Sequence, residues 1–164
     1  MPQSYEIRIR KEALKFASSH MTVFPDGTKE ALHGHGYVPS VSIRLGDASF
    51  EQMIPFSRIK EEMKRIACEW DEKVLLAVRN PFYREISRAR GELEFELCGK
   101  RYVLPLDEVV LLDVDNVTCE QLARVYHERI RAALGPVPAF AGTGALSVLI
   151  EESPGQGAVY SDEA

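Results

Sequence analysis

Three histidines are the residues of this sequence whose types and spacing could do chemistry. His33 and His35 flank a single glycine, and His20 lies thirteen positions before His33. Side chains two positions apart in a strand point to one face and sit about 6.6 Å apart along the backbone, so the pair can converge on one ion. Neutral imidazole suits zinc, and three protein ligands leave a position open for water or substrate. The pattern predicts a catalytic rather than a structural zinc site. The alternative, which the spacing alone leaves open, is that one or two of these histidines are ordinary packed or surface residues.

Length, charge and cysteine content describe a small acidic protein. The 164 residues are the size of one domain, so we expect residues 1–164 to form a single domain. A net charge of -5 gives no reason to propose a nucleic-acid partner. Residues 1–10 do not read as a signal peptide, and nothing approaches the roughly 18 apolar residues of a membrane span. We therefore expect no membrane partner. Three cysteines without zinc-ribbon spacing fit a reducing cytoplasm better than a disulfide framework, so we expect a cytoplasmic protein.

Alternation of apolar residues predicts two strands that carry the histidines. In residues 33–45 the histidine pair shares its parity with the apolar side chains, and thus continues the inward face. In residues 14–20 the inward parity includes His20. Upstream the apolar parity is reversed, and we interpret the change near residues 11–13 as a β-bulge, a feature common beside active sites. Pro39 predicts an edge strand or a bulge within the second strand.

Two amphipathic helices and a hairpin follow these strands. Apolar residues at three- and four-residue steps predict helices at 56–70 and at about 119–134. Glu62 falls on the polar side of the first helix and His127 on that of the second, so we expect both at the surface. Between the helices, alternation around a Gly-Lys turn in residues 93–104 predicts a β-hairpin.

A glutamate at the end of the last predicted strand is a candidate binding residue. The strand runs from Ala145 to Glu152, and Glu152 shares the parity of its apolar residues. A carboxylate on a buried face is costly unless it is paired or meets a ligand. The alternative is that the strand ends before Glu152, in which case this glutamate and Glu151 are both solvated.

Six short motifs follow one another along the chain. They are Phe16-Ala17-Ser18-Ser19-His20, His33-Gly34-His35-Gly36-Tyr37, Phe56-Ser57-Arg58-Ile59-Lys60, Asp71-Glu72-Lys73-Val74-Leu75, Asn116-Val117-Thr118-Cys119-Glu120-Gln121-Leu122-Ala123 and Glu152-Ser153. Over about residues 16–160 their order resembles the 6-pyruvoyl-tetrahydropterin synthase and 6-carboxy-tetrahydropterin synthase family, pterin enzymes of the tunnelling fold. Each motif alone is weak, but six in order make the resemblance specific.

The resemblance implies a fold, a metal and an assembly. The fold is the α+β tunnelling fold, an antiparallel β-sheet with two helices on one face, here with the hairpin inserted. His20, His33 and His35 are assigned as zinc ligands. Subunits are expected to form trimers that stack into a homo-hexamer, a dimer of trimers, with active sites at subunit interfaces. Such enzymes are zinc-dependent lyases on dihydropterins, in which zinc lowers the pKa of side-chain hydroxyls while a base moves protons.

The resemblance also assigns residues to the pterin ring. Glu152 matches a glutamate that accepts hydrogen bonds from the pterin amino group and ring N–H, a bidentate pairing that orients the ring. Thr118 and Glu120 match residues that line the same pocket. Thr118 also forms a capping-box pattern with Gln121, so the alternative is that these residues start the second helix. The two roles are compatible.

The chain departs from the family at the catalytic base. The usual base is a cysteine shortly before the His-Gly-His motif, but Lys29 and Gly27 occupy the two positions where it is expected. Glu30 offers a replacement, because Glu-x-x-His-Gly-His resembles a variant branch in which glutamate substitutes for cysteine. That branch is associated with cleaving dihydroneopterin to 6-hydroxymethyl-dihydropterin. The alternative is that Glu30 is a solvated residue of a turn-rich loop.

The proton relay differs at a second place. Asp71 is retained, whereas Glu72 stands where the family has a histidine. Two adjacent carboxylates repel, so one of them tends to hold a proton and can donate it. The alternative is a charged turn after the first helix. Cys68 and Cys119 are the stand-in nucleophiles to consider, and unpaired cysteines are more often inert than reactive.

Three functions are compatible with these residues. The first is a zinc-dependent enzyme acting on the side chain of 7,8-dihydroneopterin or its triphosphate, with Glu30 as base and Asp71 and Glu72 as proton carriers. The alternatives are a conventional 6-carboxy- or 6-pyruvoyl-tetrahydropterin synthase with rearranged catalytic groups, and a catalytically inactive pterin-binding protein. The arginine-rich segment 79–90 either receives a substrate triphosphate or is a solvated basic loop.

Overall fold

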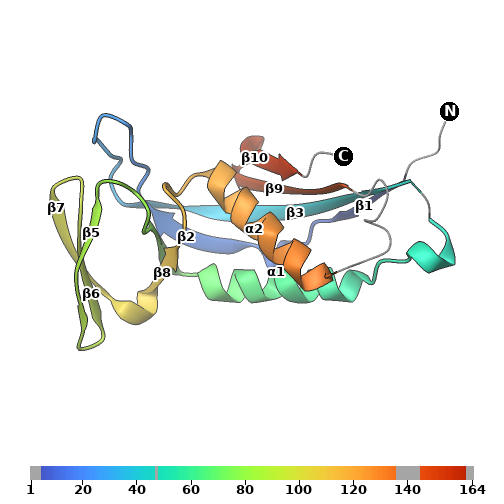
Figure 1. Ribbon diagram of the computed structural model, residues 1–164, viewed down its shortest axis with the longest axis horizontal. Helices are drawn as coiled ribbons and strands as arrows, with labels where there is room; N and C mark the ends of the chain where they lie inside the picture. Colours follow the sequence, from blue (N-terminus) through green and yellow to red (C-terminus); the bar gives the residue numbers. More distant parts are fainter. Residues whose placement is uncertain (1–4, 47, 136–144, 162–164) are drawn as a thin grey trace.

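The computed structural model describes residues 5–46, 48–135 and 145–161 (Figure 1). Its strands are β1 (Tyr5–Ile9), β2 (Phe16–His20), β3 (His33–Leu45), β4 (Lys73–Ala77), β5 (Tyr83–Ala89), β6 (Glu92–Leu97), β7 (Lys100–Pro105), β8 (Val109–Leu112), β9 (Ala145–Ser153) and β10 (Gln156–Ser161). Its helices are α1 (Phe56–Trp70) and α2 (Cys119–Leu134), with short 3-10 helices η1 (Glu12–Leu14), η2 (Phe50–Gln52) and η3 (Leu106–Glu108). The predicted α+β class is confirmed, and both helices have their predicted bounds. That residues 1–164 form one domain stays a prediction.

The large sheet is organised around β3, the longest strand. Its order is β10-β9-β3-β2-β4-β8, and β1 also pairs with β3. Strand β3 is antiparallel to β1, β2 and β9, whereas the pairs β2–β4 and β4–β8 are parallel. The expected antiparallel sheet is therefore present, and two parallel pairs extend it at one edge.

Strands β1 and β2 follow one another along the same edge of β3. β1 pairs with residues 41–45 and β2 with residues 33–37, so residues 10–15 lie opposite residues 38–40. The extra residues are taken up by η1, so the predicted change of register is made by a 3-10 turn and not by a β-bulge. Pro39 lies opposite this gap on an interior strand, which corrects the edge-strand prediction. A position with no neighbour on one side tolerates a residue that lacks an N–H donor.

The two helices pack on each other and on one face of the large sheet, where they bury the main core (Figure 1). Glu62 and His127 lie inside this layer, so the prediction that both are at the surface is wrong. Glu62 Oε1 accepts a hydrogen bond from Arg129 Nε of the other helix at 3.0 Å. The His127 ring packs against Tyr160 of β10, with ring centroids 5.0 Å apart. The helical period shows which side of a helix is polar, but it carries no information on what covers that side.

Strands β5, β6 and β7 form a separate three-stranded antiparallel sheet. The β6–β7 hairpin is as predicted. Residues 83–89 of the arginine-rich segment form strand β5, which is largely exposed, so this part is a solvated strand and not a loop. Arginines of this segment pair with glutamates of the same small sheet, in Arg84–Glu96 and Arg88–Glu85. The apolar side chains of the small sheet pack with Met21 and Val23 in a second hydrophobic cluster. The small sheet thus supports the connection between β2 and β3.

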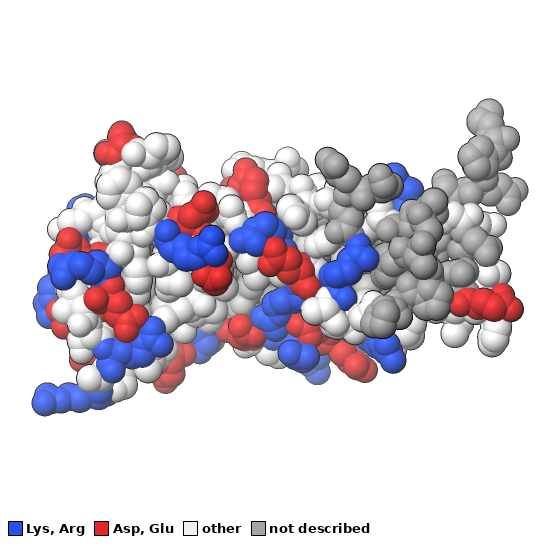
Figure 2. All heavy atoms as spheres, viewed as in Figure 1, with Lys and Arg blue, Asp and Glu red and all other residues white. Residues whose placement is uncertain are grey.

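The described surface carries charges of both signs. On the face shown in Figure 2, basic and acidic side chains are interspersed over the helices and over the small sheet. Within the described ranges, no helix is long and apolar enough to cross a membrane.

Candidate metal centre

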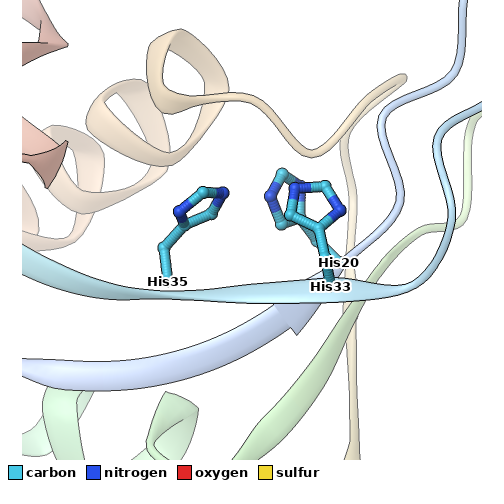
Figure 3. A group of neighbouring side chains, drawn as sticks. All are labelled: His20, His33 and His35. Carbon is cyan, nitrogen blue, oxygen red and sulfur yellow. The ribbon is translucent and has the colours of Figure 1, made fainter.

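The strand register brings the three histidines together. His20 is the last residue of β2 and pairs directly with His33, the first residue of β3. His35 lies on the same side of β3 as His33, so all three rings rise toward one another on one side of the strand (Figure 3). Their ring centroids lie 4.6 to 5.5 Å apart. One nitrogen from each ring lies within 4.8 Å of the others, which is close enough to share a metal ion.

Backbone carbonyls set the tautomer of two of these rings. The Nδ1 of His20 donates to the Val117 carbonyl at 2.9 Å, and the Nδ1 of His33 donates in the same way to Ala31. Both rings therefore carry the lone pair on Nε2. The Nε2 of His20 is buried without a hydrogen-bond partner among the described residues, a costly arrangement that a bound metal relieves. Burial lowers the pKa of His20, which keeps its ring neutral, so the donor set fits zinc.

Gly34 allows the close approach of β2 and β3 that the histidines need. A Cβ at Gly34 would lie 2.9 Å from the Ser18 carbonyl oxygen and 3.1 Å from Ser19 Oγ. Gly36 has open space at the equivalent position. A side chain at Gly34, but not at Gly36, would therefore push the strands apart and displace His20 from its partners.

A cavity of about 360 Å³ opens beside the histidines. The triad lines it together with Thr22, Glu30, Thr118, Cys119, Glu120, Glu152, Gln156 and Gly157. Every residue predicted to bind the metal or the pterin thus lines one cavity, and so does Glu30. Thr22 and Gln156 were not identified from the sequence, because neither belongs to a motif and each reaches the cavity from a strand end or a connection.

Glu152 lies within β9, which continues to Ser153, and its side chain lines the triad cavity whereas that of Glu151 does not. The alternative that the strand ends before Glu152 is therefore wrong. The Oε1 of Glu152 accepts a hydrogen bond from Gln156 Nε2 at 2.6 Å, and its Oε2 accepts one from the Cys119 thiol at 3.3 Å. The same Oε2 lies 3.9 Å from His35 Nε2. The carboxylate is thus held in the cavity wall, next to the triad.

Glu30 lies beside the triad, although it belongs to the irregular connection between β2 and β3. Its Oε2 is 3.8 Å from the Nε2 of His33. Its amide donates to the Thr22 carbonyl at 3.0 Å, and its carbonyl accepts a hydrogen bond from Lys29 Nζ at 2.9 Å. The Lys29 ammonium also lies over the ring of Tyr102 in β7, 5.2 Å from the ring centre. The backbone of Glu30 is therefore tethered, while its side chain remains 44% exposed.

Thr118 and Glu120 lie at the start of α2. The Oγ1 of Thr118 accepts a hydrogen bond from the Gln121 amide at 3.4 Å, so Thr118 is the N-cap of the helix. A hydrogen bond from the Thr118 side chain lowers the pKa of Glu120. Helix capping and cavity lining therefore coincide at these residues.

Asp71 and Glu72 do not line the triad cavity within one copy of the chain. Asp71 Oδ1 accepts a hydrogen bond from the Ala17 amide at 2.7 Å, which ties the end of α1 to β2. Glu72 has a positive φ of 57°. It lines a second cavity, of about 460 Å³, together with Lys73, Glu108 and residues of β2 and β3 that include His35. The structure thus separates these carboxylates from Glu30.

Comparison with known proteins supports one family. A model of the 6-pyruvoyl tetrahydropterin synthase family matches residues 8–163. A protein of Methanocaldococcus jannaschii, provisionally named 6-carboxy-5,6,7,8-tetrahydropterin synthase, is 33% identical over 150 residues, which cover 90% of this chain and 89% of the relative. The crystal structure of 6-pyruvoyl tetrahydropterin synthase from Plasmodium vivax is 19% identical, covers 99% of both chains and has a TM-score of 0.86. A variant of that enzyme, with alanine in place of a glutamate named as a catalytic residue, is 18% identical with the same coverage and TM-score of 0.86.

The chain belongs to the 6-pyruvoyl tetrahydropterin synthase family. Members of this family are lyases on pterins and are in general zinc-dependent. The fold implied by the six motifs is confirmed by the likeness to the P. vivax enzyme. In this chain, His20, His33 and His35 are a group that could hold the metal ion.

Proposed function

We propose that this protein is a zinc-dependent lyase that cleaves the side chain of 7,8-dihydroneopterin, or of its triphosphate, with Glu30 in place of the usual cysteine base. The proposed product is 6-hydroxymethyl-dihydropterin. One observation carries the proposal: Glu30 lines the same cavity as the three histidines, with its Oε2 3.8 Å from His33 Nε2. The name of the P. vivax variant supports a carboxylate in this role, since it describes a glutamate as a catalytic residue of that enzyme.

The cavity residues divide into a metal-binding part and a ring-binding part. The three histidines hold the zinc ion, which, when bound, lowers the pKa of a substrate hydroxyl and stabilises developing negative charge. Glu152 accepts hydrogen bonds from the amino group and ring N–H of the pterin, with Thr118 and Glu120 beside the ring. The cavity volume of about 360 Å³ is in the range of small-molecule sites.

Glu30 performs the first proton transfer. It removes the proton of the 2′ hydroxyl, and the C1′–C2′ bond breaks as C2′ becomes the carbonyl carbon of the departing aldehyde. The electron pair of the broken bond passes to C1′ and is delocalised into the pterin ring. C1′ then takes up one proton, which completes the hydroxymethyl product. A carboxylate within hydrogen-bond reach of the hydroxyl can accept and return a proton in this way.

Asp71 and Glu72 take part in proton transfer from a neighbouring copy of the chain. Within one copy they do not line the triad cavity, so this role requires an assembly. We propose the homo-hexamer, a dimer of trimers in the cytoplasm, in which the active sites lie at subunit interfaces.

Two other functions use the same pocket. The name of the M. jannaschii relative favours a conventional 6-carboxy-tetrahydropterin synthase with rearranged catalytic groups. A catalytically inactive pterin-binding protein is the third candidate, because binding and turnover use the same histidines and Glu152.

Product identification separates the three functions. Zinc-loaded protein is incubated separately with dihydroneopterin and with its triphosphate, and products are identified by mass, with Glu30→Gln as the paired variant. Hydroxymethyl-dihydropterin formed by the parent and not by the variant supports the proposal. Carboxy- or pyruvoyl-tetrahydropterin indicates the second function, and pterin binding without turnover indicates the third. A protein that binds no zinc, and whose His33→Ala variant keeps its stability and pterin affinity, overturns the metal site.

A further inference from the structure

The Glu152 carboxylate is held by donors from two different elements. Gln156, at the start of β10, donates from Nε2 to Oε1 at 2.6 Å. Cys119, in the first turn of α2, donates from Sγ to Oε2 at 3.3 Å. One anchor comes from the neighbouring strand and the other from a helix 33 residues away in the sequence. Two anchors on separate oxygens fix both the position and the plane of the carboxylate.

The Cys119 thiol is a donor and not a nucleophile in this arrangement. The residue is buried, with 8% of its surface exposed. Burial, followed by the hydrogen bond to Glu152, raises the pKa of Cys119 to about 12. The thiol therefore keeps its proton at neutral pH, and a carboxylate oxygen can only accept it as a hydrogen bond. This geometry agrees with the expectation from the sequence that Cys119 is unreactive. A thiol that does not react can still hold Glu152 in place through its hydrogen bond.

The two anchors leave Glu152 able to bind a ligand. An ionised carboxylate has about four lone-pair positions, so two remain after Gln156 and Cys119 are satisfied. A bidentate contact to the amino group and ring N–H of a pterin needs two acceptors in a defined plane. We propose that Cys119 is a positioning residue that orients Glu152 for the pterin ring. This inference rests on the proposed function, because it assumes that Glu152 receives a pterin.

Binding and kinetics of the parent and three variants test the inference. Zinc-loaded parent, Cys119→Ala, Cys119→Ser and the control Cys68→Ala are titrated with dihydroneopterin by fluorescence, and their KM and kcat values are measured. Loss of one hydrogen bond to a charged group corresponds to about a tenfold increase in Kd and KM for Cys119→Ala, with kcat within about twofold of the parent. Cys119→Ser is expected to restore binding, because its hydroxyl donates to the same oxygen. Cys68 is exposed on α1, and its variant should match the parent.

A double-mutant cycle distinguishes positioning from packing. If Cys119 acts through Glu152, then Cys119→Ala has no further effect on Kd in a Glu152→Ala background. An equal loss of affinity in both backgrounds, or a Cys119→Ser variant as weak as Cys119→Ala at unchanged zinc content, overturns the inference. Wild-type affinity in Glu152→Ala also overturns it.

The same measurements separate failure of the inference from failure of the proposed function. A parent that binds dihydroneopterin but forms no hydroxymethyl product contradicts the proposed function, and the cycle on Kd still decides the role of Cys119. A parent that forms the product while Cys119→Ala binds like wild type contradicts the inference alone. A parent that neither binds nor converts the pterin contradicts both.

Discussion

The strands that carry the three histidines and the connections that carry Glu30 and Glu72 are held in place by different contacts. His20 and His33 face each other across the β2–β3 ladder, and backbone carbonyls orient both rings. Glu30 and Glu72 lie in connections outside any ladder, one after β2 and the other after α1. A ladder fixes the distance between opposite residues, whereas a connection can change without moving the sheet. The sheet thus fixes the positions of the histidine triad, whereas the connections that carry Glu30 and Glu72 can vary without moving it.

The triad strands and the connection that carries Glu30 also pack against different hydrophobic clusters. The strands of the triad pack over the main core with α1 and α2, whereas the connection before Glu30 packs on the small β5–β7 sheet. Phe82 lies against Gly27, where an added Cβ would come within 3.1 Å of its ring, and Tyr102 lies under Lys29. The position of Glu30 therefore depends on the small sheet more than on the main core.

Loss of a metal ligand is the largest effect expected. His20→Ala should remove zinc and lower turnover at least about a thousandfold, since the metal contributes several kcal/mol and each 1.4 kcal/mol is about tenfold. Metal content measured by mass spectrometry, together with product formation, checks this. His127→Gln removes the other buried histidine and should keep its zinc. Stoichiometric zinc in His20→Ala would contradict the comparison, because it would show that the pairing of His20 with His33 across β2 and β3 is not needed for metal binding.

Replacing the carboxylate on the connection should leave binding intact. Glu30→Gln is expected to lower kcat by about 10²- to 10⁴-fold, the usual contribution of a general base, at unchanged zinc content and pterin Kd. Steady-state kinetics and fluorescence titration provide the two readouts. Glu12→Gln, an exposed glutamate of η1, serves as the matched control. An unchanged kcat in Glu30→Gln contradicts the assignment of the base.

The two glycines beside the histidines offer a test of the strand spacing. Gly34→Ala is expected to lower the free energy of unfolding by about 1–3 kcal/mol and to weaken zinc binding, since its Cβ meets the β2 backbone. Gly36→Ala places a methyl group in open space and should change stability by less than about 0.5 kcal/mol. Chemical denaturation and zinc titration of the pair measure both effects. Equal stability and equal zinc affinity in the two variants would contradict the close approach of β2 and β3 at Gly34.

Removing a contact between the small sheet and the connection that carries Glu30 is expected to have the smallest effect. Tyr102→Leu removes the ring under Lys29, a contact worth about 0.5–1 kcal/mol, so kcat should fall about two- to fivefold with zinc retained. Tyr102→Phe keeps the ring and should match the parent. If the leucine variant loses stability but keeps its kcat, the small sheet supports the fold without positioning the base.

Much of the local structure could be predicted from the sequence. The three- and four-residue steps gave the bounds of α1 and α2, and strand parity predicted that His33 and His35 share one face. The prediction that Glu152 lies within the last strand and faces a site was also correct, since it lines the triad cavity. These features could be read because helical and strand periods are set by local backbone geometry. The parallel pairs β2–β4 and β4–β8 could not be predicted in this way, because they depend on which edge of the sheet a distant segment packs against.

The sequence by itself determined the types of residue available, the faces on which they lie and the family to which the chain belongs. Tertiary structure alone decided that Glu62 and His127 are covered, that Cys119 meets Glu152, and that Glu30 but not Glu72 lines the triad cavity. The physical reason is that periodicity records how an element exposes its own side chains. Contacts between segments dozens of residues apart depend on packing and register, which no local pattern contains.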